Sequence, residues 1–165
     1  RPLMSLLIRD ATPADAEAIH AAIVAMGELL GTAHKIESTP EILASEGLAP
    51  GRAFEGLVAE VDGTFAGMCL YLPVFSTWLG KPSVYVQDLY VDERFRGMKI
   101  GEALIRRVAR IGRARGASHL RLAVDLDNTR AQAFYERLGV AHYADDRIHA
   151  AYGEAFDRLS EGDER

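Results

Sequence analysis

The chain has 165 residues, of which 48% are hydrophobic and 26% charged, and its formal net charge is -5 at pH 7. This size and composition are typical of one globular domain, and the acidic balance argues against nucleic acid as a partner while favouring cationic or neutral substrates. No apolar run approaches the roughly 20 residues of a membrane span, and the single cysteine, Cys69, excludes a disulfide framework within one chain.

We expect a single domain over residues 4–165, with Met4 as the native start and Arg1 to Leu3 as additional residues. No signal-peptide pattern is present. A cysteine inside an apolar run is most often a small buried hydrophobe, and one free cysteine suits a reducing compartment. The sequence therefore predicts a cytoplasmic protein that has no metal site and does not act at a membrane.

The N-terminal half predicts a strand, two helices and a β-hairpin. Residues 6–9 form the first strand, and Thr12 with Pro13 then begins a helix that Gly31 ends. A second, short helix begins at Thr39 and Pro40 and ends near Gly47. Residues 54–61 and 64–74 are rich in strand formers and flank Asp62-Gly63, a strong hairpin signal. The apolar stripe of the first helix consists of Ile19, Ile23, Met26 and Leu30.

The C-terminal half alternates strands with helices. Residues 84–91 predict a strand, followed by a helix from Ile100 that Gly116 ends, a strand over 119–125 and a helix over 127–139. Two last strands are expected at 140–143 and 150–156. The order β-α-α-β-β-β-α-β-α-β-β predicts an α+β fold, with helices on a mixed, mostly antiparallel central sheet.

The turn after the strand at 84–91 has the composition of a phosphate-binding loop. It reads Arg96-Gly97-Met98-Lys99-Ile100-Gly101 and leads into a helix, whose first N–H groups have no partner inside the helix. The glycines lack Cβ, which allows a ligand to approach the backbone closely, and Arg96 and Lys99 supply positive charge. On these residues alone, a plain strand-to-helix turn remains an equal alternative.

A second segment, Asn128 to Val140, opens on an asparagine that can cap its helix or bond a ligand amide. It also contains Tyr135, an amphipathic residue whose hydroxyl can donate a proton. Core packing with the hydroxyl at the rim is the alternative role for Tyr135.

Together the two segments resemble the GNAT superfamily of acetyl-CoA-dependent N-acetyltransferases. Its pattern is Arg/Gln-x-x-Gly-x-Gly/Ala after the fourth strand, followed by Asn-x-x-Ala-x-x-Phe-Tyr-x-x-x-Gly. The resemblance implies a GNAT-type fold and direct attack of a substrate amine on the thioester, with Tyr135 as the general acid for the CoA thiolate. It also implies that backbone N–H groups of the loop hold the pyrophosphate and that Asn128 and the strand backbone bind pantetheine. The implied acetyl-CoA contacts are Leu89, Tyr90, Val91, Arg96, Gly97, Met98, Lys99, Ile100, Gly101, Glu102 and Asn128.

Two positions depart from the pattern. Lys99 stands where the family has glycine, and a positive φ there would cost about 1 kcal/mol. Residues 84–91 resemble the diamine and polyamine acetyltransferase branch, which reads Tyr-Leu-Glu-Asp-Leu/Phe-Tyr/Phe-Val. Gln87 occupies the glutamate position, and glutamine cannot accept a proton as a base.

Several groups remain open as the base or as acceptor-site residues. Asp88 is adjacent to Gln87, but strand alternation predicts that it faces the other side of the sheet. Asp125 and Asp127 lie at the end of the neighbouring strand, and His34 follows the first helix. A water chain, or an amine of low pKa, needs no dedicated side chain.

Three functions are compatible with these residues. The first is acetyl transfer to a small primary amine, of a diamine, polyamine or amino-acid-like molecule. The second is an acyl-CoA-binding sensor on the same fold, which Gln87 and Lys99 leave open. The third is acetylation of peptide or protein amines. By resemblance, a homodimer through the C-terminal strands is also expected.

Overall fold

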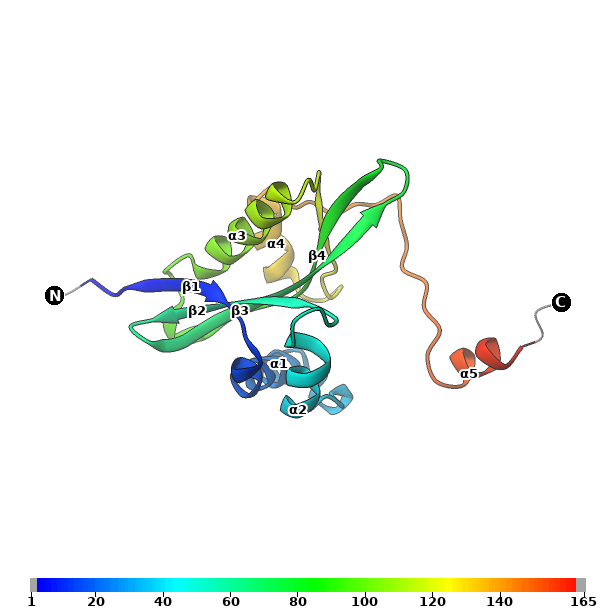
Figure 1. Cartoon of the computed structure of the whole chain (residues 1–165), viewed down its shortest axis with the longest axis horizontal. Coiled ribbons are helices and arrows are strands. Elements are labelled where there is room, and N and C mark those ends of the chain that lie inside the picture. Colours follow the sequence, from blue (N-terminus) through cyan, green and yellow to red (C-terminus); the bar gives the residue numbers. More distant parts are fainter. Residues whose placement is uncertain (1–2, 163–165) are drawn as a thin grey trace.

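A computed structural model describes residues 3–162 and is built on one five-stranded sheet with the strand order β1-β2-β3-β4-β5 (Figure 1). The first four strands pair antiparallel and β5 pairs parallel to β4, so the predicted α+β fold is confirmed. The strands are β1 (Leu6–Asp10), β2 (Glu55–Val61), β3 (Thr64–Ser76), β4 (Lys81–Val91) and β5 (Leu120–Leu122). The helices are α1 (Ala16–Leu30), α2 (Pro40–Ile42), α3 (Ile100–Ala114), α4 (Thr129–Arg137) and α5 (Glu154–Glu161), and the short turns are η1 (Pro13–Asp15), η2 (Ala33–Lys35), η3 (Leu43–Leu48) and η4 (Glu93–Phe95).

Local signals in the N-terminal half form the elements they predict. Thr12 and Asp15 form a reciprocal capping box around η1, and α1 ends at Gly31, whose φ is 70°. The Thr39 hydroxyl accepts a hydrogen bond from the Ile42 N–H, which begins the second helical segment. In the β2–β3 hairpin, Asp62 and Gly63 have φ angles of 49° and 81°, the positive values that a tight hairpin turn requires.

Helices cover both faces of the sheet (Figure 1). Because side chains alternate along β2, Leu57 and Ala59 pack toward Leu104 of α3, whereas Val58 packs toward Ile19 of α1. All five of these residues are at most 1% exposed. No helix within residues 3–162 has the length and apolar character needed to cross a membrane.

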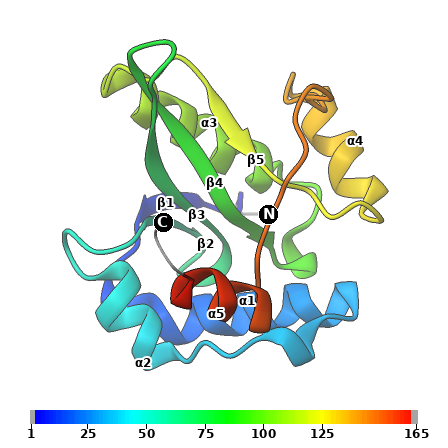
Figure 2. The same ribbon diagram turned by 90° about the vertical axis from the view of Figure 1, so that its right-hand side faces the viewer.

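The strands β4 and β5 pair over only part of their predicted lengths. Their ladder runs from Val84 opposite Leu120 to Val86 opposite Leu122 and then stops. The predicted strand over 119–125 is therefore shortened to Leu120–Leu122, because a strand continues only where a neighbour completes its hydrogen bonds. Beyond Val86, the edge of β4 on the β5 side lies open, and α4 stands across from it (Figure 2).

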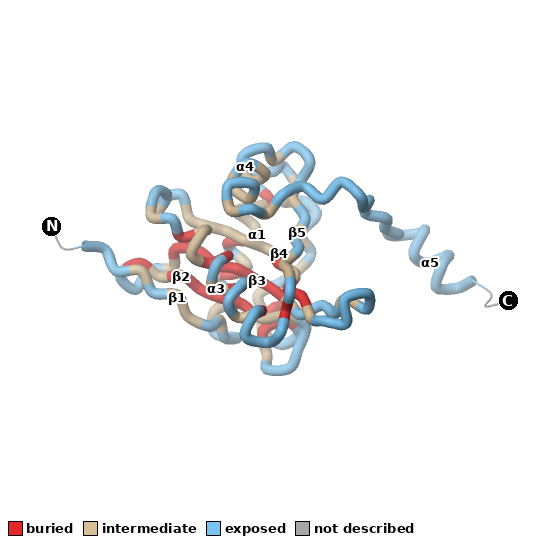
Figure 3. Tube along the Cα trace, turned by 90° about the horizontal axis from the view of Figure 1, so that it is seen from above, coloured by how far each residue is buried: buried red, intermediate tan, exposed pale blue. Residues whose placement is uncertain are grey.

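The two predicted C-terminal strands are wrong. Residues 140–143 and 150–153 form no strand, and α5 takes up the last three residues of the strand expected over 150–156. The reason is the absence of a neighbour. Every residue from 141 to 162 is exposed, and this segment extends from α4 away from the sheet (Figure 3). Alternating apolar residues do not make a strand without a second strand to pair with.

Candidate active site

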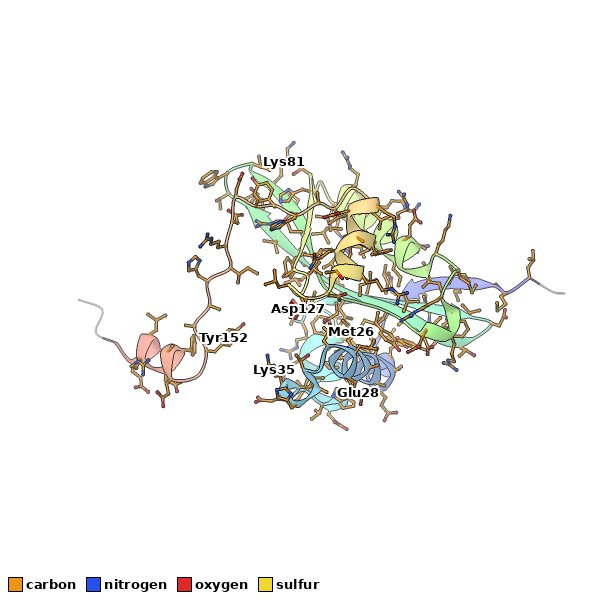
Figure 4. The ribbon with its side chains drawn as sticks, turned by 180° about the vertical axis from the view of Figure 1, so that it is seen from behind. Met26, Glu28, Lys35, Lys81, Asp127 and Tyr152 are labelled. Atoms are coloured by element: carbon orange, nitrogen blue, oxygen red, sulfur yellow. The ribbon has the colours of Figure 1, made fainter. Side chains whose placement is uncertain are left out.

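The open edge of β4 borders a cavity of about 190 Å³. Met26 and Leu30 of α1 line one side of this cavity, and α4 with its preceding loop lines the other. Figure 4 labels Met26 on α1 and Asp127 in the loop that precedes α4. The cavity brings together six residues predicted from sequence: Gln87, Asp88, Leu89, Asp125, Asn128 and Tyr135.

A β-bulge interrupts the pairing of β3 with β4 at Gln87. On β3, Leu70 is opposite Asp88 and the next residue, Tyr71, is opposite Val86, so Gln87 is left without a partner. The strict alternation that would separate Gln87 from Asp88 is interrupted at this point. Both residues line the same cavity, and the expectation that their side chains face opposite sides of the sheet stays a prediction.

A second cavity, of about 230 Å³, follows the next residues of β4. Tyr90, Val91 and Arg96, all predicted from sequence, line it together with Glu28 of α1 and Glu93 of η4. The two cavities therefore follow consecutive stretches of β4. Two carboxylates and one guanidinium line the second cavity, so its lining carries more negative than positive charge.

The loop after η4 presents a row of backbone donors. Among the described residues, the N–H groups of Gly97 to Glu102 have no hydrogen-bond acceptor, and the first helical bond of α3 runs from Ala103 N to Lys99 O, at 3.0 Å. Six consecutive free N–H groups at the start of a 15-residue helix are the arrangement that binds a phosphate. Met98 and Ile100, which the sequence analysis assigned to this loop, each present one of these N–H groups.

Lys99 adopts the left-handed conformation, with φ 56° and ψ 34°. Its φ is positive, as the sequence analysis required for backbone strain at this residue. The strain costs about 1 kcal/mol in a residue with a side chain. Gly97 has φ 87°, a value that glycine adopts without this cost.

Replacing Lys99 by glycine is expected to raise the free energy of unfolding, by up to about 1 kcal/mol, because the strain disappears. Gly97→Ala is the matched control in the opposite direction. A Cβ at Gly97 meets no atom within 4 Å, so any loss of stability comes from φ alone. Urea denaturation measures both. A destabilised Lys99→Gly protein would mean that the Lys99 side chain stabilises the loop by more than its strain costs.

Asn128 and Tyr135 stand on α4 beside the first cavity. Asn128 caps this helix, since its Oδ1 accepts a hydrogen bond from Ala131 N at 3.1 Å, while its Nδ2 group has no acceptor among the described residues. The Tyr135 ring packs edge-to-face on Phe134, with centroids 5.1 Å apart. Burial, and secondarily the nearby Cys69 and Asp88, raise the pKa of Tyr135 to about 12. The Tyr135 hydroxyl therefore stays protonated at neutral pH.

Asp88 and Cys69 lie close to Tyr135. Burial raises the pKa of Asp88 above its ordinary value of 3.8. Burial and the charge of Asp88 raise the pKa of the Cys69 thiol to about 12. A buried thiol with that pKa is a poor nucleophile, and Cys69 lines neither cavity. Among residues 3–162, no group of three metal-ligating side chains is gathered together.

His34 lies apart from the other predicted residues. It is exposed in η2 and lines neither cavity. Conversely, sequence reasoning did not assign Met26, Leu30 or Glu28 to the site. Met26 and Leu30 belong to the predicted apolar stripe of α1, so the signal was present but indicated only the core.

Comparisons with known proteins agree with this geometry. The model of the acetyltransferase (GNAT) family matches residues 15–140. Thialysine N-epsilon-acetyltransferase of Sus scrofa is 33% identical over 145 residues, covering 83% of this chain and 85% of that protein. An integron cassette protein from V. cholerae shares the fold, with a TM-score of 0.82 and 18% identity over 97% of this chain and 100% of its own. An aminoglycoside N-acetyltransferase in complex with CoA has a TM-score of 0.66 and 17% identity, over 93% and 97% of the two chains.

The open five-stranded sheet with its flanking helices is thus a fold shared with these solved structures. The chain belongs to the acetyltransferase (GNAT) family and is an acetyl-CoA-dependent N-acetyltransferase.

Proposed function

We propose that this enzyme acetylates the primary amine of a small cationic molecule of the diamine, polyamine or amino-acid class. Four carboxylates line the two cavities and supply negative charge for an ammonium group: Glu28, Asp88, Glu93 and Asp125. The relative named thialysine N-epsilon-acetyltransferase supports an acceptor of this size and charge. The observation that carries the proposal is the open edge of β4, which joins acidic cavities to a phosphate-binding loop.

Acetyl-CoA is proposed to lie between the loop and α4. Backbone N–H groups from Gly97 to Glu102 would hold the pyrophosphate, with Arg96 beside it. The pantetheine amides would bond the unpaired backbone of Leu89 to Val91 and the free Nδ2 group of Asn128. Both ends of this path offer donors or acceptors that lack protein partners, which is the property a peptide-like arm requires.

The reaction then proceeds by direct transfer. The bound ammonium group first gives one proton to a base, which passes it to solvent. The neutral amine nitrogen then attacks the thioester carbonyl carbon, and backbone N–H groups of β4 stabilise the oxyanion. The carbon–sulfur bond breaks, and the departing thiolate takes the proton of the Tyr135 hydroxyl. The amide nitrogen loses its extra proton to a base, and solvent restores the Tyr135 proton.

Asp88 is the base we favour. It is the partly buried carboxylate of the cavity that contains Tyr135, and burial raises its pKa toward the working range of a base. Asp125 is exposed, and one of its carboxylate oxygens already accepts a hydrogen bond from Asp127 N at 2.9 Å. Gln87, beside Asp88 in the bulge, would orient the amine through its carbonyl oxygen.

Asp88→Asn is expected to lower kcat by about 100-fold, the typical contribution of a general base, and to stabilise the protein at pH 7. Because burial raises the folded-state pKa of Asp88, the folded protein holds this proton more tightly than the unfolded chain does. The bound proton stabilises the folded protein in full below pH 3.8, the ordinary pKa of the carboxyl group. This stabilisation is lost as pH rises through the folded-state pKa, so the buried negative charge of Asp88 destabilises the protein at pH 7.

Denaturation midpoints of the wild type and Asp88→Asn, at pH 7 and below pH 4, check the expected gain in stability. Steady-state kinetics checks the expected loss of kcat. Gln87→Glu is the matched control, since it adds a carboxylate one residue away and leaves Asp88 in place. Full activity in Asp88→Asn would assign the base to another group or to water.

Acceptor profiling tests the function. The enzyme is incubated with acetyl-CoA and panels of diamines, polyamines, amino acids, aminosugars and peptides, and the products are identified by mass spectrometry. We expect acetylation of the cationic small molecules, with release of CoA thiol in equal amount. Preference for peptides would replace the proposed acceptor class, and acetyl-CoA binding without turnover on any amine would favour a sensor.

A further inference from the structure

Arg96 differs from the other arginines near the start of α3 in having no fixed anionic partner. Arg94, two residues earlier, donates two side-chain hydrogen bonds to Asp92, at 3.1 and 2.9 Å. Arg106 of α3 pairs with Glu102 at 2.9 Å. Within residues 3–162, the exposed Arg96 guanidinium forms neither a hydrogen bond nor an ion pair. Its charge is therefore available to an anion on either side of it.

Two places that attract a guanidinium lie beside Arg96. One is the row of free N–H groups that begins at Gly97, where we propose that the pyrophosphate binds. The other is the second cavity, of about 230 Å³, which Arg96 lines together with Glu28 and Glu93. In the part of the chain that the structure describes, the side chains of these two glutamates form no ion pair. The guanidinium thus stands between an acidic cavity and a site for an anionic cofactor.

Tyr90 shows that the charge of Arg96 acts inside the second cavity, which this tyrosine also lines. Burial raises the pKa of Tyr90, and the negative charges of Asp92 and Glu93 add to the increase. The positive charges of Arg94 and Arg96 oppose it. A guanidinium that offsets the carboxylates of a cavity also weakens their attraction for a second cation, such as the ammonium group of an acceptor.

We propose that Arg96 is an internal cation of the second cavity in the free enzyme and turns to the pyrophosphate when acetyl-CoA binds. The movement leaves Glu28 and Glu93 without a counter-charge, so the cavity then binds an ammonium group of the acceptor more tightly. The cofactor opens the acceptor site through the rotation of one side chain. The inference rests on the proposed function, because it takes the second cavity as a site for a cationic acceptor.

Movement of Arg96 and direct attraction between charges predict different behaviour. Phosphate groups attract a nearby ammonium group whether or not an arginine is present, and the pairwise energies of charges in fixed positions add. A side chain that pairs with only one of two anionic sites at a time makes those sites interdependent. By linkage, an amine then raises the affinity for CoA by the same factor by which CoA raises the affinity for the amine.

A double-mutant cycle on CoA affinity tests the movement without any acceptor. Isothermal titration gives the Kd for CoA of the wild type, of Glu28→Gln combined with Glu93→Gln, of Arg96→Gln and of the triple variant. We expect the paired glutamine changes to tighten CoA binding about fivefold when Arg96 is present, because they release it from the cavity, and less than about twofold when it is absent. Equal tightening in both backgrounds means simple repulsion, and no tightening means that the cavity does not hold Arg96; either result overturns the proposal.

Binding of a diamine tests the effect on the acceptor site. Putrescine is titrated into each protein with and without CoA, at a CoA concentration that saturates the protein in question. We expect CoA to tighten putrescine binding at least about fivefold in the wild type. Arg96→Gln should bind putrescine more tightly than the wild type does when CoA is absent, and CoA should then add less than about twofold.

Arg94→Gln is the matched control, because Arg94 is paired with Asp92 and lines neither cavity. It should keep the response of the wild type to CoA. A wild-type affinity for putrescine that CoA leaves unchanged, or a response that persists in Arg96→Gln, overturns the proposal. Absence of putrescine binding in every protein contradicts the proposed acceptor class instead, and the cycle on CoA affinity then decides whether Arg96 moves.

Discussion

Replacing Tyr135 by phenylalanine is expected to lower kcat by about 100- to 10,000-fold, the range for loss of a general acid. The ring packing on Phe134 is retained, so the fold and the KM for acetyl-CoA should change little. Burial raises the pKa of Tyr135 to about 12, which keeps the hydroxyl protonated at neutral pH as a donor to the leaving sulfur. Steady-state thiol release at saturating acetyl-CoA and amine measures the effect.

Tyr85→Phe is the control for this change. Tyr85 lies on β4, opposite Arg121 of β5, and lines neither cavity. Its loss of a hydroxyl should leave kcat within a factor of about two. A decrease of less than tenfold in Tyr135→Phe would show that water or another group protonates the thiolate.

Gly101→Asp is expected to weaken CoA binding by at least about 100-fold, equivalent to roughly 2.7 kcal/mol. Gly101 lies in the first turn of α3, within the row of free N–H groups. A carboxylate there repels the pyrophosphate and competes with it for the same donors. Isothermal titration with CoA gives the affinity directly, without reference to the amine acceptor.

Gly101→Asn separates charge from shape. A Cβ at Gly101 lies 3.2 Å from Cζ of Phe134, so any side chain there requires a small adjustment of that ring. The asparagine variant carries the same adjustment without the charge, and we expect it to bind CoA about tenfold more tightly than the aspartate variant. Equal affinities in the wild type and Gly101→Asp would remove the loop from the CoA site.

Features that depend on neighbouring residues were predictable from the sequence. The helix start at Thr12, the helix end at Gly31 and the hairpin at Asp62-Gly63 all form as expected, because a few adjacent residues decide each conformation. The same holds for the loop from Gly97 to Glu102, which lies at the start of a helix whose apolar stripe is clear. Most of the predicted cofactor contacts belong to such short segments.

Features that depend on residues distant in the chain were not predictable from the sequence. Period-two alternation gives no sign of the bulge against β3 at Gln87, or of the cavity that Gln87 and Asp88 both line. The strand over 119–125 is cut short where β4 diverges from it. Residues 140–156 have strand-forming character but find no strand to pair with in their own chain.

The order of the elements as far as α4, the candidate phosphate-binding turn and the candidate acid Tyr135 thus follow from the amino-acid sequence. Their information is local, since helix ends and turns are set by φ preferences and caps within a few residues. The opening beside β4, the shared environment of Asp88 and Tyr135 and the exposure of residues 141–162 depend on the three-dimensional arrangement. A strand is stabilised by hydrogen bonds to a neighbouring strand that is distant in the chain, so its length is known only once that strand is in place. The pKa of a buried carboxyl group likewise depends on distant residues that exclude water from it.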